Sequence, residues 1–209
     1  MNIKKVSFFI FVFLAIGIGL YPLSYLVLDN NLNGKSQELL ASVLWNVCFY
    51  LHISLGGISL LIGWSQFIEK FRKKNIRLHR IIGKIYVVSV LLSALCGIYI
   101  GYYATGGMIP AVGFISLGII WFYTTLKAFI EIKEGRVWEH EKMMIYSYAA
   151  CFAAVTLRLL LPLLIVIFND FITAYQMVAW LCWVPNLMVA YFIILKKSKN
   201  KMIQESSNL

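Results

Sequence analysis

Six long apolar segments make up most of this 209-residue chain and leave little polypeptide between them. A helix needs roughly 20 mostly apolar residues to cross a hydrocarbon core about 30 Å thick. Segments of this kind lie near 7–28, 40–67, 84–103, 109–130, 143–168 and 173–195. They predict an all-α membrane protein, a six-transmembrane-helix bundle that forms one domain over residues 1–196. Residues 197–209 are expected to form a polar cytoplasmic tail.

The composition and the first segment both favour helices that stay in the membrane. Hydrophobic residues make up 61% of the chain and charged residues 13%, against about 45–50% and 25% in soluble domains. The first segment follows Lys4 and Lys5, as a signal peptide would. However, its apolar run exceeds the roughly 7–15 residues of a signal core. It also lacks a clear cleavage site, so we expect the first helix to be retained.

The basic residues predict the orientation. They lie in short segments beside apolar helices, which is the positive-inside pattern. With the N-terminus inside, every lysine and arginine except Lys35 and Arg158 falls on the cytoplasmic side. We therefore expect both termini in the cytoplasm and a multi-pass protein of the cell membrane. This placement accounts for the net charge of +10 without a nucleic-acid partner. It predicts contact with anionic lipid headgroups, at about 1 kcal/mol per well-placed charge.

Cysteines and glycines are read as packing residues. Cys48, Cys96, Cys151 and Cys182 all lie in apolar segments without a CxxC pair, so neither a disulfide framework nor a zinc site is predicted. The second helix contains three glycines and the third a small-xxx-small motif, both typical of close helix packing. The glycines are Gly56, Gly57 and Gly63, then Gly97 and Gly101, and a tight turn is expected at Gly106 and Gly107.

Polar residues recur at helical spacing in three of the apolar segments. An ionisable group in a bilayer costs several kcal/mol unless it is paired or faces a cavity. These stripes should therefore face the interior of the bundle. Their members are His52, Gly56, Ser59, Gly63 and Gln66; then His79, Gly83, Tyr86, Ser93 and Gly97; then His140, Met144, Ser147, Cys151, Ala154 and Arg158.

The third stripe carries the one arginine expected inside the membrane. His140 and Arg158 are 18 positions apart, which is five turns or about 27 Å if the helix is continuous. Arg158 needs a carbonyl, a carboxylate, a lipid phosphate or an anionic ligand for its donors. Asp170 is the nearest acid in sequence that could lie on the outer side. Snorkelling to outer headgroups is the structural alternative.

The sixth segment contains Trp180, Trp183, Pro185 and Asn186. Pro185 frees a backbone carbonyl that Asn186, or a neighbour of it, could satisfy. Asn186 and Gln66 join Arg158 as candidate ligand-binding residues. No acid pair, Ser–His–Asp set or phosphate-binding loop occurs in the sequence, so catalytic residues are not assigned and enzymatic activity stays open.

Several segments resemble a family of bacterial membrane proteins that is described only as a domain of unknown function. The resemblance covers roughly residues 40–195 and implies a fold and a location, without an activity. Glu141 is a departure, because the family often has a basic residue after the histidine of the fifth helix. The matching stretches are LHISLGGISLLIGWSQF (51–67), LHRIIGKIYVVSVLLSALCGIYIG (78–101), GFISLGIIWFYTTLKA (113–128), HEKMMIYSYAACFAAVTLRLLLPL (140–163) and WLCWVPNLMVA (180–190).

The histidine pattern is also similar to part of the diheme b-type transmembrane cytochromes, which place one histidine on each of helices 2 to 5. The similarity implies His79 and His140 as a pair of heme b ligands, with a quinone or a membrane redox partner. This chain has three histidines and none in its fourth helix, so His52 would lack a partner and one heme at most follows.

Three functions stay open on this evidence. The first is a noncatalytic membrane partner or sensor in which the histidines are structural. The second is a heme-binding electron-transfer protein that uses His79 and His140. The third is a transporter or a lipid- or anion-binding protein in which Arg158 holds the anion and His52 gates or relays protons.

Overall fold

The computed structural model describes residues 3–27 and 35–206, and all of its regular secondary structure in these ranges is helical. Six helical stretches among the described residues are long and apolar enough to cross a membrane. They are Val6–Leu23, Val43–Phe67, Ile76–Tyr102, Met108–Lys133, Val137–Phe168 and Phe171–Ile203. The predicted fold class, an all-α bundle with six membrane-spanning segments, is confirmed.

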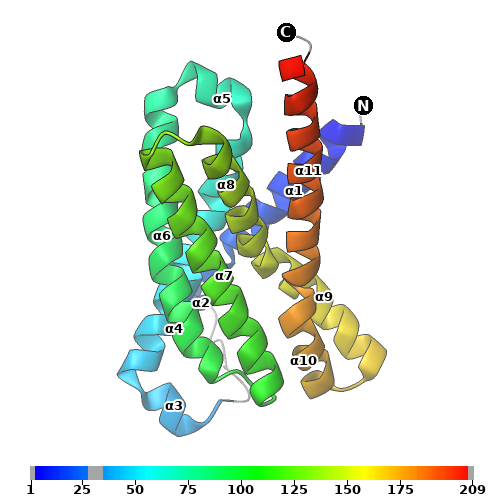
Figure 1. The fold of residues 1–209 in the computed structure, drawn as a ribbon. Helices are drawn as coiled ribbons and strands as arrows, with labels where there is room; N and C mark the ends of the chain where they lie inside the picture. The colour runs from blue at the N-terminus through cyan, green and yellow to red at the C-terminus, as the bar shows by residue number, and fades with distance from the viewer. Residues whose placement is uncertain (1–2, 28–34, 207–209) are drawn as a thin grey trace.

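The helices follow the chain in a simple up-and-down order (Figure 1). Both termini and the short helix α5 lie at one end of the bundle. The α3 helix and the α6–α7 and α9–α10 connections lie at the other end (Figure 1). In chain order the elements are α1 Ile3–Gly19, η1 Tyr21–Leu23, α2 Ser24–Val27, α3 Gln37–Ala41, α4 Val43–Gly63, η2 Trp64–Phe67, α5 Glu69–Lys74, α6 Ile76–Tyr102, α7 Met108–Lys133, α8 Val137–Cys151, α9 Ala153–Phe168, α10 Phe171–Leu181 and α11 Val184–Ser206.

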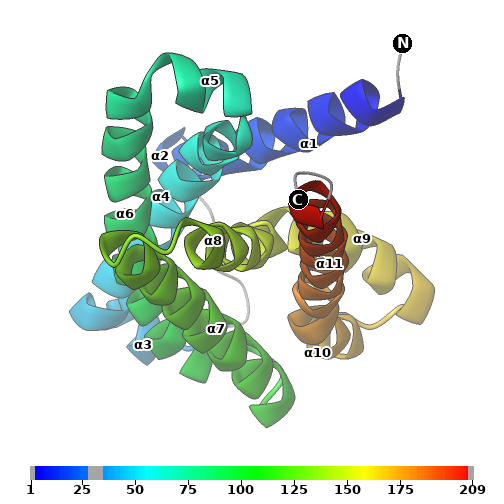
Figure 2. The same cartoon turned by 45° about the horizontal axis from the view of Figure 1, so that its top comes forward.

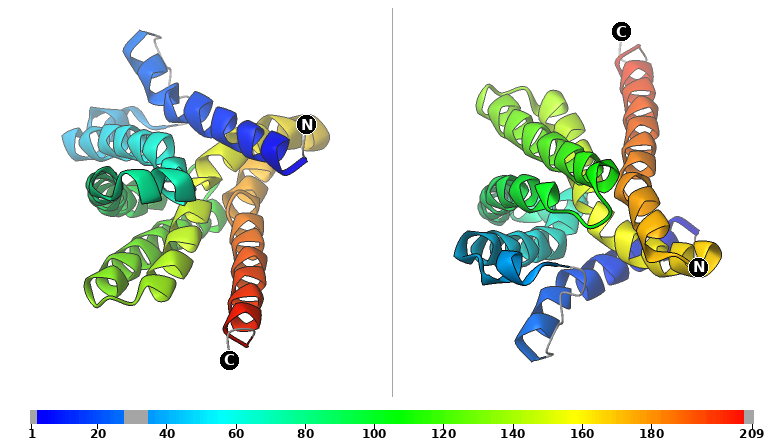
Figure 3. Two further views of the ribbon diagram at one scale, coloured as in Figure 1. Left: turned by 90° about the horizontal axis from the view of Figure 1, so that it is seen from above. Right: turned by 90° about the horizontal axis from the view of Figure 1, so that it is seen from below.

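The packed centre consists of α4, α6, α7 and α8, each lying against the next. Helix α1 crosses obliquely over α4 and also reaches α9, as the views from the side and from above show (Figures 2 and 3). Helix α10 packs on α7 and α9, and α11 packs on α8. Helices α9 and α10 form a second wall of the bundle, which meets the α4–α6–α7 row where α10 packs on α7 (Figure 3).

Several helix ends differ from the predicted boundaries. The third membrane helix begins at Ile76 and not near 84, so His79 lies inside α6 and not on a loop. The last helix continues to Ser206, through much of the expected polar tail; residues 207–209 lie outside the described ranges. The first span ends in a 3-10 turn because Pro22 lies at its start and cannot continue an α-helix.

Two membrane helices are broken near their middle. The α8 helix ends at Cys151 and α9 starts at Ala153, with a change of direction at Phe152 (Figure 1). The continuous helix that would have placed His140 and Arg158 on one straight face does not form. The last span breaks between Leu181 and Val184. There Asn186 donates from Nδ2 to the carbonyl oxygen of Cys182 at 3.0 Å.

The two connections at the α3 end have the predicted turn residues. Gly106 and Gly107 have φ values of 93° and 87°, in the left-handed region that glycine adopts without strain. Asn169 ends α9 with φ of 48°. Asp170 then caps α10, because its Oδ2 accepts a hydrogen bond from the backbone N–H of Thr173 at 2.7 Å.

This cap gives a pH-dependent prediction. Hydrogen bonds from Thr173, through its side chain and its backbone N–H, hold the pKa of the Asp170 carboxyl below its usual value. A depressed carboxyl pKa stabilises the fold above the unfolded-state value of about 3.9 and ceases to do so as the pH falls through the folded-state value. Asp170→Ala is therefore expected to lower the Tm in detergent at neutral pH. The difference in Tm between this variant and the wild type should disappear at acidic pH. Asp170→Asn, which also caps helices, should keep most of the Tm and lose the pH dependence of the difference. An Asp170→Ala Tm equal to wild type at pH 7 would contradict the role of this cap.

The α4 and α6 stripes pack directly against each other, in antiparallel register. A Cβ added at Gly56 would lie 3.3 Å from the Ser93 hydroxyl, and one at Gly83 would lie 3.5 Å from Gln66 Oε1. One at Gly63 would lie 2.8 Å from the Tyr86 ring. The expectation that these stripes face the interior is thus met in the structure, and the glycines allow the two helices to approach.

Candidate functional site

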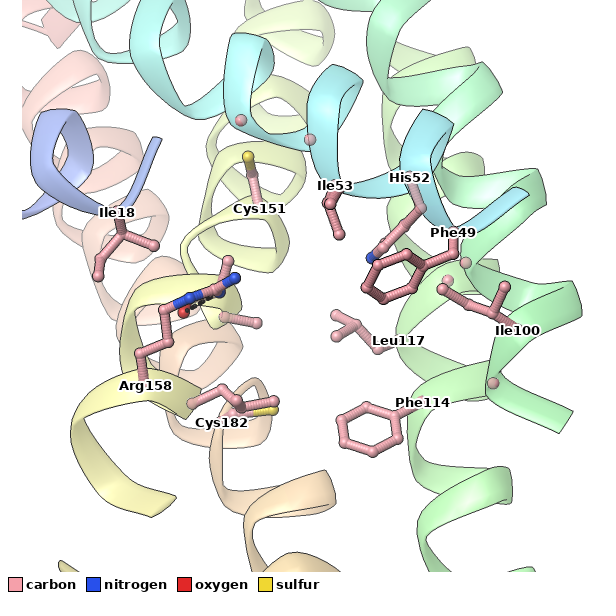
Figure 4. A pocket seen from close by; sticks show the side chains of 18 of the residues that line it. Ile18, Phe49, His52, Ile53, Ile100, Phe114, Leu117, Cys151, Arg158 and Cys182 are labelled. Carbon is pink, nitrogen blue, oxygen red and sulfur yellow. Dashed lines mark hydrogen bonds between the residues drawn. The ribbon is translucent and has the colours of Figure 1, made fainter. Parts of the chain in front are cut away.

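A cavity of about 690 Å³ lies between the row of α4, α6 and α7 and the wall of α9 and α10. It reaches from the middle of the bundle to the end away from the termini, where Lys35 and Ala104 line it. Helix α1 and the turn after it close a further side through Ile18 and Tyr21. In Figure 4, Arg158 reaches into this space from one wall, while His52 and aromatic side chains project from the opposite wall.

Arg158 lies on α9 and is partly buried. Its Nη1 donates to the carbonyl oxygen of Ala154 at 3.0 Å, one turn earlier. The guanidinium lies over the ring of Tyr21, 4.5 Å from the centroid, which is a favourable cation–π position. The ion pairs formed between described side chains do not include it. Asp170, the acid considered for it, caps α10.

The other donors of Arg158 therefore have no protein partner in the part of the chain that the structure describes. A guanidinium has five N–H donors in a planar fork. One is used on Ala154. A charge in a membrane interior is expensive unless it is paired or lies in a polar cavity, so the remaining donors are available to a ligand or to water.

Hydrogen bonds to α6 hold the ring of His52 in place. Its Nδ1 lies 2.9 Å from the carbonyl oxygen of Ser93 and 3.2 Å from the Ser93 hydroxyl. The hydroxyl in turn donates to the carbonyl oxygen of His52 at 2.9 Å. Because a carbonyl only accepts, the proton of the neutral ring must be on Nδ1. The ring lies against Gly97, where a Cβ would come within 2.8 Å of Nδ1.

These hydrogen bonds determine which ring nitrogen of His52 is left to contact a ligand in the cavity. The ring lines the cavity wall, and its Nε2 has no hydrogen-bond partner among the described residues. In the Nδ1–H tautomer, Nε2 is an acceptor, and it becomes a donor when the ring is protonated. The glycine that makes room for the ring is Gly97 on the neighbouring helix α6.

A layer of hydrogen-bonded hydroxyls lies beyond the mid-bundle end of the cavity. Tyr86 and Ser147 hydroxyls are 2.9 Å apart, and those of Ser147 and Thr125 are 2.6 Å apart. Thr125 donates to the carbonyl oxygen of Trp121 at 2.8 Å, so the chain of donors runs from Tyr86 through Ser147 to Thr125 and ends there. Tyr148 donates to the carbonyl oxygen of Leu60 at 2.9 Å. These bonds join α4, α6, α7 and α8 next to Leu60 and Trp121, which line the cavity and form what we call its floor.

Two charged side chains among the described residues line the cavity, Lys35 and Arg158, and both are basic. The Lys35 ammonium donates to the carbonyl oxygen of Tyr103, and burial lowers its pKa. The acidic side chains in ion pairs lie elsewhere, for example Glu131 with Lys127 and Arg136. Groups of three or more potential metal-ligating side chains do not occur in the described ranges.

The other candidate residues lie away from this cavity. Asn186 joins the two broken spans, with Nδ2 also 3.0 Å from the Thr156 hydroxyl. Gln66 is buried and donates to Ser65 at 3.3 Å. His140 Nδ1 lies 2.8 Å from the carbonyl oxygen of Ala128. His79 Nδ1 is buried without a hydrogen-bond partner. Of the six candidates, His52 and Arg158 line the same cavity. His79 and His140 lie outside it, close enough to each other to interact electrostatically.

The heme expected from the cytochrome similarity does not fit this cavity through its predicted ligands. Neither His79 nor His140 lines it. A ligating histidine usually donates its second ring N–H to a carbonyl or carboxylate. His140 has such a carbonyl, whereas the buried Nδ1 of His79 has none. The His79–His140 heme stays a prediction of the sequence.

Three contributors to the site were not recognised in the sequence as site residues. Tyr21 lies in η1 at the end of the first span and Tyr25 lies in α2 just after it; both line the cavity, and the guanidinium of Arg158 lies over Tyr21. Lys35 was noted only as a cation on the outer side. Lys35 and Arg158 are the two basic residues that the positive-inside pattern does not place on the cytoplasmic side. This shared exception is the sequence signal that could have linked them.

Residues 49–194 match the family model described as "Predicted membrane protein (DUF2306)". This span contains both His52 and Arg158 and runs from within α4 to within α11. No curated protein and no solved structure matches the chain.

Proposed function

The chain belongs to the DUF2306 family of predicted membrane proteins, and from this premise we propose that it binds an anionic ligand inside the membrane, with Arg158 as the anchor. One observation carries the proposal. A guanidinium faces a cavity within a membrane-spanning bundle, and no carboxylate among the described residues pairs with it. An anion entering the cavity supplies the missing counter-charge.

The rest of the site supports an anion in preference to a cation. Lys35 adds a second positive charge to the lining, and the residues that line the cavity in the described ranges include no acidic side chain. The Nε2 of His52, on the wall facing Arg158 (Figure 4), is an acceptor in the neutral ring and donates to an anion only when the ring is protonated. Bidentate pairing with a carboxylate or phosphate suits the guanidinium fork better than it suits a lysine.

The orientation gives the site a side of the membrane. The basic residues of α5 and of the start of α6 lie at the same end as both termini (Figure 1). With this end in the cytoplasm, against anionic headgroups, the cavity lies in the outer half of the bundle. The hydroxyl layer below it separates it from the inner side. The protein would then take its ligand from the outer side or the outer leaflet, as a carrier or a receptor does.

Arg158→Gln tests this function. Native mass spectrometry of the wild-type protein in a mild nonionic detergent is expected to show a co-purifying anionic adduct. Arg158→Gln should lose it, because a glutamine has no charge and no fork. Arg80→Gln, at the exposed basic end, is the matched control and should keep the adduct. An adduct of equal occupancy in Arg158→Gln would contradict Arg158 as the anchor.

The same site predicts an unusual effect on stability. Arginine in the middle of a membrane helix costs roughly 2.5–3.5 kcal/mol on insertion scales. Replacing an unpaired Arg158 with methionine should therefore raise the Tm of the ligand-free protein, even though it removes the contact with Tyr21. A purely structural Arg158 predicts the opposite, a lower Tm in Arg158→Met. Thermal unfolding of delipidated samples in detergent separates the two.

A further inference from the structure

The distribution of charge within the cavity points to the kind of anion. We propose that the ligand is an amphiphile with one anionic head, a carboxylate or a phosphate, and one apolar chain. The head would pair with Arg158 and the chain would lie toward the floor at Trp121. This inference rests on the proposed function and narrows it from any anion to a single-chain amphiphile.

The size of the cavity exceeds what an anionic group alone would fill. A volume of about 690 Å³ lies within the roughly 300–1,000 Å³ typical of small-molecule pockets. It suits one chain and its head better than the two chains of a membrane phospholipid. An inorganic anion would occupy a fraction of the space and leave the remainder without polar contacts.

The lining changes character from the mouth to the floor. Polar groups come from the walls and the mouth, through Arg158, His52 and Lys35. The side nearest the middle of the bundle is apolar and buried, and consists of Leu60, Ala94, Trp121, Ala150 and Cys151. An apolar chain stabilises the complex there by about 25 cal/mol for each Å² that it removes from water. A fully polar solute would lose hydrogen bonds to water in the same place.

The floor also determines which way such a ligand lies. Next to Trp121, the hydroxyl of Tyr86 donates to that of Ser147, and the hydroxyl of Ser147 donates to that of Thr125. The hydroxyl of Thr125 donates to the carbonyl oxygen of Trp121. This leaves no free hydroxyl donor in the layer for an anionic head. The indole Nε1 of Trp121 has no hydrogen-bond partner among the described residues, but it is buried and uncharged, so it is a weaker site for the head than the guanidinium of Arg158. The head therefore remains with Arg158, and the end of the chain approaches the indole of Trp121, which is 6% exposed.

This placement can be tested with a brominated fatty acid, because a bromine atom quenches a tryptophan only at short range. With 11-bromoundecanoate, wild-type protein in nonionic detergent should show saturable quenching of its tryptophan fluorescence. Trp121→Phe should lose most of the saturable component, since phenylalanine keeps the apolar lining while removing the reporter. Arg158→Gln should weaken the apparent affinity by about tenfold or more, equivalent to about 1.4 kcal/mol.

Two further probes separate the failure of this inference from the failure of the proposed function. The neutral 11-bromo-1-undecanol should quench at least about tenfold more weakly than the acid, which shows that the charge matters. If inorganic phosphate binds through Arg158 while 11-bromoundecanoate gives no saturable quenching, the ligand is a small anion and the amphiphile is wrong. If acid and alcohol quench equally and Arg158→Gln changes nothing, the chain only partitions into detergent, and both proposals fail.

Discussion

Gly63→Val is expected to prevent the bundle from reaching its native packing. A Cβ at this position would lie 2.4 Å from Cε2 of Tyr148 and 2.8 Å from Cε2 of Tyr86. Both rings are buried, and both hydroxyls are fixed, on Leu60 and Ser147. Overpacking a core usually costs about 1–3 kcal/mol. Here two rings that are held by hydrogen bonds on two helices must move. We therefore expect the free energy of unfolding to fall by an amount at or above the top of that range.

The measurement is the yield of monodisperse protein and its Tm in detergent. Gly17→Val is the matched control, because Gly17 is exposed on the first membrane helix and a Cβ there meets nothing within 4 Å. Its Tm should stay within a few degrees of wild type. A Gly63→Val protein that expresses and melts like Gly17→Val would show that α4 and α8 do not approach each other as closely as the structure has them.

Gly97→Val is expected to be destabilising in the wild-type background and much less so when His52 is alanine. A Cβ at Gly97 would lie 2.8 Å from His52 Nδ1 and 2.9 Å from Cε1. The valine would push the ring away from Ser93 and break the hydrogen bond that fixes its tautomer. His52→Ala removes the ring that causes the clash. The coupling between the two substitutions should therefore be at least about 1 kcal/mol, within the range found for residues in contact.

A double-mutant cycle on thermal or denaturant unfolding measures this coupling. Gly113→Val is the control substitution, because the Cβ of residue 113 would meet the backbone oxygen of Ala179 at 2.9 Å, far from His52 in the chain and on another helix pair. The loss of stability caused by Gly113→Val should be the same with histidine and with alanine at position 52. Additive effects of Gly97→Val and His52→Ala would mean that the imidazole does not lie on Gly97.

The fold was largely predictable from the sequence, because a bilayer imposes the length and composition of a crossing helix. Helix number, fold class and the turn at Gly106 and Gly107 all follow from local patterns and are confirmed. The break at Phe152 was not predictable in this way. The second half of the segment from Val137 to Phe168 is apolar apart from Thr156 and Arg158, and its Pro162 lies ten residues beyond the break.

The site was predictable in part. His52 and Arg158 were singled out because ionisable side chains in a membrane need a partner or a cavity. Helical spacing also predicted which faces point inward. It could not show that α9 bends away from α8, and this bend is what opens the space between Arg158 and His52. The residues that surround them from α1 and from the segment before α3 depend on long-range packing, which no local pattern in the sequence specifies.

The antiparallel register of α4 and α6 has a consequence for how this protein can vary. The pairs Gly97 with His52, Gly56 with Ser93 and Gly63 with Tyr86 each place a glycine against a larger side chain on the opposite helix. The glycine belongs to α6 in the first pair and to α4 in the other two, so either helix can gain bulk at one of these positions only if the facing residue loses it. Descendants of this sequence should therefore change in matched pairs along the seam, and an insertion of one residue in either helix would shift every pair beyond the insertion out of register.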